Sequence, residues 1–184
     1  ETDTTQLEEI PTHEHYALVD ISNQMLEDSV FNLEAEMQEE FATQLAKNEG
    51  TAFISGTSVG QPEGLLTNSS VGETVSGNAN TLLADGLIDL VHAVKTPYGT
   101  GASFIFNRTT LAAIRKLKDT AGQYVFQAGM MLTAGVPNTI LGYPYIEMPD
   151  MPDVSANAFP VMFGDFSRGY MIVDRTNLAI LRDP

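Results

Sequence analysis

Cysteine is absent from this sequence of 184 residues. Its absence excludes disulfides and thiolate metal sites, and it agrees with a reducing cytoplasm. No apolar run approaches the roughly 18 residues that a membrane-spanning helix needs, so we expect no membrane partner. The N-terminus, Glu1-Thr2-Asp3, has neither the basic start nor the apolar stretch of a signal peptide. It also lacks an initiator Met, which is typical of a fragment or a processed product.

Basic residues are scarce. The chain holds 9 Lys and Arg against 24 Asp and Glu, for a formal net charge of −15. Most of the imbalance lies in residues 1–50, which contain 13 acidic residues and one basic residue, Lys47. A field of this sign repels nucleic-acid phosphates, so we expect no specific nucleic-acid binding. The acidic stretch is either a solvated helix face or a surface that meets a basic partner or avoids DNA, and charge alone does not choose.

Hydrophobic residues make up 43% of the chain and charged residues 18%, which is typical of a folded globular protein. Residues 14–22 predict a strand, because β-forming residues alternate there. From residue 23 the apolar residues recur at helical spacing. This apolar stripe consists of Leu26, Val30, Leu33, Met37, Phe41 and Leu45. It predicts a helix over residues 32–49 that ends at Gly50, with a short separate helix before it.

Residues 55–80 are rich in turn-forming residues and predict loops and a subdomain boundary. Beyond them we expect a helix over residues 81–95, capped by Thr81, and another that starts at Asn107 and ends at Gly122. Predicted strands cover residues 103–106, 139–141, 143–148, 160–163 and 170–173. Helices that precede strands without regular alternation favour an α+β fold.

A search for catalytic, cofactor-binding and metal sites finds none. His13-Glu14-His15 lacks a visible third ligand, and His92 lies within a helical pattern, where a packed or partly exposed side chain is the ordinary interpretation. The glycines near residue 60 lack the Gly-Lys-Ser/Thr ending of a phosphate loop, because Gly64 is followed by two leucines. There is no Gly-x-Ser-x-Gly nucleophile elbow.

Several short motifs follow one another along the chain, and their order and spacing are informative. The residues Val19-Asp20-Ile21-Ser22 precede the long acidic helix, and Gly60-Gln61-Pro62-Glu63-Gly64-Leu65-Leu66 follows it. Further on come Phe106-Asn107-Arg108, then Leu141-Gly142-Tyr143-Pro144, then Phe163-Gly164-Asp165 and Val173-Asp174-Arg175. In this order and spacing the sequence resembles the major capsid proteins of tailed bacteriophages, which have the Hong Kong 97-type fold. The motif positions carried over from the family are Gly56, Gln61, Pro62, Gly64, Asp119, Gly122, Gly142, Tyr143, Pro144, Phe163, Gly164, Asp165, Asp174 and Arg175.

The resemblance implies an α+β capsid fold and a structural, non-enzymatic role. Residues 1–72 would be part of the peripheral domain, with the spine helix at about 32–49. Residues 73–176 would form the axial domain, and residues 177–184 would return toward the periphery. Family members assemble into hexamers and pentamers that close an icosahedral head around the genome, some with a scaffold and a maturation protease. The resemblance therefore implies a virion protein of a phage or prophage, assembled in the cytoplasm of a bacterial host.

Family members also have an N-terminal arm and a long extended loop before the point where this sequence starts, and further strands after its last residue. Both are missing here, so no cross-linking residue is carried over. Three other hypotheses remain at this stage. The first is an encapsulin-type nanocompartment shell of the same fold. The others are a hydrolase that uses the acidic helix with His92, and a monomeric binding module.

Overall fold

The computed structural model describes residues 10–21, 32–119, 121–124 and 139–175. The chain divides into two compact units, one comprising Glu1–Asn68 and Ile172–Pro184 and the other Ser69–Met171. Each unit is described by itself below. The short helix expected within residues 23–31 lies outside the described residues.

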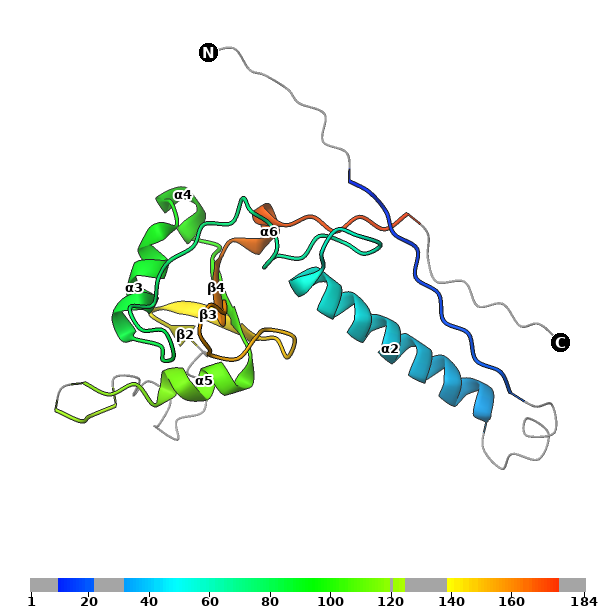
Figure 1. Ribbon diagram of the computed structural model, residues 1–184, viewed down its shortest axis with the longest axis horizontal. Coiled ribbons are helices and arrows are strands. Elements are labelled where there is room, and N and C mark those ends of the chain that lie inside the picture. The colour runs from blue at the N-terminus through cyan, green and yellow to red at the C-terminus, as the bar shows by residue number, and fades with distance from the viewer. Residues whose placement is uncertain (1–9, 22–31, 120, 125–138, 176–184) are drawn as a thin grey trace, which may run out of the picture. The chain divides into compact units, whose positions relative to one another are not determined.

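The first unit is built around one long helix, α2 (Leu33–Ser55) (Figure 1). Asn32 caps its N-terminus, where the side-chain oxygen accepts a 3.3 Å hydrogen bond from the backbone N–H of Ala35. Glu34 and Glu36 lie in the first turn, where their negative charges suit the helix dipole. The predicted start of the helix is therefore confirmed.

The predicted end of this helix, at residue 49 before Gly50, is wrong. The helix continues to Ser55, and its last turn is capped by the chain that follows it. The backbone N–H groups of Leu65 and Leu66 donate 2.9 Å hydrogen bonds to the carbonyl oxygens of Phe53 and Ile54. A glycine inside a helix costs about 1 kcal/mol relative to alanine, and we attribute the extension to these hydrogen bonds and to the burial of the last turn.

The apolar stripe of α2 is only half-buried in the described structure. Leu33, Met37, Phe41 and Leu45 are of intermediate exposure. The buried residues of α2 are Ala52 and Ile54, both in the last turn. The stripe therefore marks one side of the helix correctly, but most of the burial in this helix lies at its C-terminal end.

The strand predicted over residues 14–22 is not formed by the described residues 14–21. Tyr16 is 90% exposed and Leu18 83% exposed. A strand requires a hydrogen-bonded neighbour, and no strand of the described chain pairs with this segment. Alternation of β-forming residues is a local signal, so it cannot supply that neighbour.

The second unit contains a four-stranded mixed sheet in the order β2-β3-β1-β4. The strands are β1 (Ser103–Phe106), β2 (Thr139–Ile140), β3 (Tyr143–Glu147) and β4 (Val161–Gly164). The central strand β1 runs parallel to β3 and antiparallel to β4. In this register Ile105 lies between Ile146 and Met162, whereas Phe104 and Phe106 point to the opposite face.

Two helices cover the face that carries the phenylalanines (Figure 1). They are α3 (Ala84–Ala93) and α5 (Arg108–Arg115). The core consists of Leu87 from α3, Phe104 and Phe106 from β1, Leu111 and Ile114 from α5, and Ile140 from β2. Two short helices, α4 (Thr96–Gly99) and α6 (Phe166–Gly169), lie outside this core. The combination of helices and a mixed sheet confirms the predicted α+β class.

Three local predictions for this unit need correction. The first helix begins at Ala84 after Leu83, and no side-chain cap forms there, so Thr81 is not its cap. The helix that starts after Asn107 ends at Arg115, well before Gly122. Residues 170–173 form no strand, because no strand of the described chain pairs with them.

Candidate functional site

The first group of motif positions closes the C-terminal end of α2. Gly56 is the C-cap residue, and its carbonyl oxygen accepts a 2.9 Å hydrogen bond from the backbone N–H of Gly64. The hydroxyl of Thr67 donates to the carbonyl oxygens of both glycines. A Cβ added to Gly56 would collide with the carbonyl oxygens of Ala52 and Pro62, and one added to Gly64 would collide with backbone atoms of Gly56 and Ile54. Only glycine fits at either position.

Residues 57–67, called the return loop here, bring Gln61 and Pro62 to the same place. The Nε2 of Gln61 donates a 3.0 Å hydrogen bond to the hydroxyl oxygen of Thr57. Thr57 and Glu63 form an isolated antiparallel β-bridge. The motif residues of this loop therefore serve one purpose, which is to turn the chain back over the last turn of α2.

Asp119 and Gly122 shape a tight turn after α5. The Oδ1 of Asp119 accepts hydrogen bonds from the backbone N–H groups of Ala121 (2.9 Å) and Gln123 (2.8 Å). Gly122 has a φ of +81°, a conformation that costs glycine little and other residues more. The turn places Lys118 over the ring of Tyr124, with its ammonium 4.9 Å from the ring centroid.

Gly142 forms the hairpin between β2 and β3. Ile140 pairs with Tyr143, which leaves a two-residue loop of Leu141 and Gly142. Their φ angles are +53° and +86°, as a type I′ hairpin turn requires. The glycine is therefore explained by the turn. Pro144 follows in β3 and pairs with Thr139 of β2.

Two motif aromatics meet in the core of the second unit. The rings of Tyr143 and Phe163 make an edge-on contact with centroids 4.9 Å apart. Phe163 also packs against Phe104, at 4.6 Å. Such pairs stabilise a core by about 0.5–1.5 kcal/mol beyond the area they bury. These residues fix the spacing of β3, β1 and β4.

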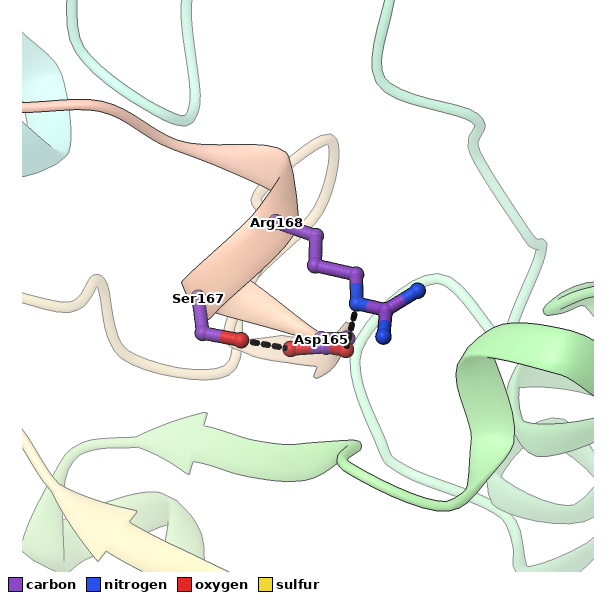
Figure 2. A network of polar contacts seen from close by, with 3 residues as sticks. All are labelled: Asp165, Ser167 and Arg168. Carbon is purple, nitrogen blue, oxygen red and sulfur yellow. Dashed lines mark hydrogen bonds and ion pairs between the residues drawn. The ribbon is translucent and has the colours of Figure 1, made fainter.

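Asp165 follows β4 and begins α6 (Figure 2). The hydroxyl of Ser167 donates a 2.6 Å hydrogen bond to its Oδ1, and the Nε of Arg168 lies 3.6 Å from its Oδ2. A Cβ added to Gly101 would lie 3.0 Å from Oδ2 of the same carboxylate, so the absence of a side chain there leaves room for Asp165. Gly164 precedes this network and has no atom within 4 Å of an added Cβ.

The remaining motif residues, Asp174 and Arg175, are exposed and lie outside any helix or strand of the described chain. The motif positions therefore gather in several separate places and do not converge on one cleft. At the positions whose contacts are described above, these residues determine the path of the backbone or a packing distance. This arrangement suits a role in shape and offers no nucleophile, base and oxyanion site together.

One polar cluster was not among the motif positions. Asn107 is 7% exposed, and its Oδ1 caps α5 by accepting a 2.7 Å hydrogen bond from the backbone N–H of Thr110. Its Nδ2 donates to the carbonyl oxygen of Met151 (3.0 Å) and to Oδ1 of Asp153 (2.7 Å). The hydroxyl of Thr109 also donates to Asp153. Hydrogen bonds from Thr109 and then Asn107 hold the pKa of the Asp153 carboxyl below its ordinary value.

The polar start of α5 was visible in the sequence, but the partner loop was not. Residues 148–153 have the sequence Met-Pro-Asp-Met-Pro-Asp, which is typical of a loop. Nothing local indicates that Met151 and Asp153 meet a residue more than forty positions earlier.

No cluster of three or more His, Asp or Glu side chains in the described part of the chain could hold a metal ion. His92 is exposed in the last turn of α3. None of the described helices is both long and apolar enough to cross a membrane.

The phage capsid family model matches residues 1–184, which is the whole sequence. The chain belongs to the phage capsid family. The family prediction made from the ordered motifs is thus confirmed. A search of the curated proteins finds no match.

Solved capsid structures agree with this assignment. The capsid of an empty gene transfer agent (GTA) particle, computed with C5 symmetry, matches 100% of this chain and 69% of its own chain, at 36% identity and a TM-score of 0.84. The capsid of the native GTA particle matches 85% of this chain and 57% of its own, at 36% identity and a TM-score of 0.76. This phage capsid family member therefore has the Hong Kong 97-type fold and is a structural shell protein of a phage-like particle.

Family membership also gives the motif positions a common interpretation. A closed shell needs many copies of one shape, so residues that hold the backbone in a defined path are as important as residues in an interface. The turns at Gly56, Gly122 and Gly142 are of this kind.

Proposed function

We propose that this chain is the greater part of a major capsid subunit whose copies form pentamers and hexamers and close an icosahedral head around a genome. The observation that supports this most is the match of the entire chain to a capsid subunit at 36% identity. At that identity the likeness extends beyond the fold to the sequence itself. A subunit of this kind acts through assembly and needs no catalytic residue.

We assign the first compact unit, with α2 as the spine helix, to the peripheral domain and the second unit to the axial domain. The assignment follows the division expected at residues 72 and 176. It is supported by the path of the chain, which leaves the first unit after Asn68 and returns to it at Ile172. The second unit has its own buried core around β1, as an independently shaped domain should.

The mechanism follows from symmetry. A contact that is weak between two copies is repeated at every equivalent position of a closed shell, and the repeated contacts sum to a stable particle. Rigid turns such as Leu141-Gly142 reduce the conformational freedom that assembly would otherwise have to restrict. A scaffold protein and a maturation protease belong to this proposal as partners, the bacterial cytoplasm as the place of assembly, and the virion as the final location.

Electron microscopy tests the proposal. The full-length gene product, expressed with its neighbouring genes, is purified by sedimentation and examined in negative stain. Uniform closed shells or capsomer rings are expected. Nucleic acid inside them would support a phage-type head, whereas an enclosed enzyme would indicate a nanocompartment of the same fold. Small discrete particles at every concentration would contradict the shell role.

A further inference from the structure

One stretch of the second unit is basic within an acidic protein. Between Asp89 and Asp119 the sequence contains no acidic residue and five of the chain's 9 Lys and Arg. Four of these five lie on α5 and immediately after it, and they form what we call the basic face. Its residues are Arg108, Arg115, Lys116 and Lys118, all exposed.

The four cations lie on exposed positions of α5 and of the residues that follow it. Leu111 and Ile114 are buried in the core, and Arg108 and Arg115 lie beside this buried stripe, while Lys116 is the C-cap residue. Arg108 and Arg115 are seven residues apart, which places them almost in line along the helix, about 10 Å from each other at 1.5 Å per residue. Arg115 donates a 3.0 Å hydrogen bond to the hydroxyl of Tyr145, and Lys118 lies over a tyrosine ring. A tyrosine is neutral, so these contacts orient the cations without neutralising them.

A complementary surface exists on the first unit. Glu36, Glu39 and Glu40 lie on one side of α2, within two turns, and all are exposed. The half-buried apolar stripe of α2 is centred on a different side of the helix, although Glu40 borders it because it lies seven residues from Leu33. The only basic residue of α2 is Lys47, further along the same side. These three glutamates form what we call the acidic face.

We infer that the basic face of α5 binds the acidic face of α2 in a second copy of this chain. The two faces have opposite charges, and Arg108 and Arg115 of one face and the three glutamates of the other are presented by helices. They are different patches of one chain, and a contact between different patches of identical subunits generates rings and closed assemblies when the rotation closes. The inference rests on the proposed shell function, because only an assembly brings many copies together.

The size of the electrostatic contribution determines whether charge reversal affects folding or assembly. One exposed ion pair contributes little to the stability of a single chain. Like charges forced together at an interface oppose binding, and opposite charges accelerate correct encounter. A repeated interface multiplies a small change, so charge reversal should affect assembly far more than folding. Salt should weaken the same contact, because exposed charges are screened over about 8 Å at physiological ionic strength.

Charge-reversal variants of the full-length protein test the inference. The first variant carries Arg108→Glu and Lys116→Glu, and the second carries Glu39→Lys and Glu40→Lys. Each alone should lower the yield of sedimenting particles tenfold or more, with an unchanged circular dichroism spectrum. Lys95→Glu and Glu73→Lys, which reverse exposed charges away from both faces, are the matched controls and should assemble as the wild type does. Combining all four reversals in one chain should restore particles.

Co-expression of the two variants decides whether the contact is between copies. In a mixed hexamer the reversed, acidic α5 of the first variant meets the reversed, basic α2 of the second, and the two native faces meet at the next contact. Hexamers that contain both chains are therefore expected by mass spectrometry. Rescue in the four-fold variant without rescue on co-expression would show a contact within one chain and overturn the inference. Normal assembly of the first variant would also overturn the inference. The same holds if its shells form but lack nucleic acid, because the basic face would then bind phosphate. If the wild type forms no shells at all, the proposed function fails and the inference fails with it.

Discussion

The side chains of Asn107 and Asp153 are joined by a 2.7 Å hydrogen bond across 46 positions of sequence. Asn107 lies at the end of β1 and caps α5, while Asp153 lies in the loop between β3 and β4. The bond therefore ties that loop to the helix that covers the sheet. The same asparagine donates to the carbonyl oxygen of Met151, so one buried amide organises three segments of the second unit.

Replacement of this amide should destabilise the second unit. Asn107→Ala removes the cap of α5 and both donors to the loop, so we expect a loss of about 2–4 kcal/mol in the free energy of unfolding. Urea denaturation followed by circular dichroism measures it. Asn107→Asp keeps the capping oxygen and removes the donors to the loop. Its loss in the free energy of unfolding should therefore be smaller near the midpoint of the acid titration of the carboxyl groups than at neutral pH. Equal stability of Asn107→Ala and the wild type would contradict the role assigned to Asn107.

The pH dependence of stability should include a contribution from Asp153. Hydrogen bonds from Thr109 and Asn107 lower the folded-state pKa of its carboxyl below 3.8, the ordinary value. The stabilisation is therefore complete above about pH 3.8 and disappears as the pH falls through the lower, folded-state pKa. Urea denaturation at a series of pH values from 6 to 2.5 should show a constant difference in stability between wild type and Asp153→Asn above about pH 3.8, and a shrinking difference as the pH falls further. Asp89→Asn, on the exposed side of α3, serves as the control, and a gap that does not change with pH would count against this assignment.

Gly64 should tolerate no side chain. Gly64→Ala places a methyl group against the backbone of Gly56 and Ile54, so the return loop must move away from α2. We expect a loss of about 1–3 kcal/mol, which is usual for forced overpacking. Hydrogen exchange is the measurement, since the amides of Leu65 and Leu66 are protected by carbonyls of α2 and should exchange faster in the variant. Gly72→Ala has open space around the added methyl and should exchange as the wild type does.

The core of the second unit should depend strongly on Phe104. This side chain is 0% exposed and is enclosed by α3, α5 and the neighbouring strands. Phe104→Ala should cost about 3–5 kcal/mol, from lost burial and the cavity it leaves. Phe159, which is 42% exposed, is the comparison, and Phe159→Ala should cost about 1 kcal/mol or less. Similar losses for the two variants in urea denaturation would be incompatible with a core centred on β1.

Local signals in the sequence were sufficient for several elements. The strand at Ser103–Phe106 was predicted with its observed bounds, and the start of α5 after Asn107 was predicted from its polar cap. The start of α2 near residue 32 was predicted from the helical spacing of its apolar residues. In each case the information lies within one turn or one strand, where hydrogen bonding and side-chain periodicity act directly.

Contacts between distant residues explain the predictions that failed. Gly50 is a reasonable helix end by propensity, but the helix continues because Leu65 and Leu66 cap its last turn. Residues 14–21 and 170–173 are rich in β-forming residues, yet no strand of the described chain pairs with them. The bond between Asn107 and Asp153 could not be inferred either, because nothing in a loop sequence states which distant side chain it will meet.

The sequence by itself determined the family, the α+β class and the course of the elements whose signals are local. It also determined the separation of charge between an acidic N-terminal part and a basic stretch around α5. The tertiary structure alone decided where α2 ends, how the strands are ordered, and which side chains cover the sheet. The physical reason is that periodicity and capping act over a few residues, whereas burial and long-range hydrogen bonds depend on parts of the chain that only folding brings together.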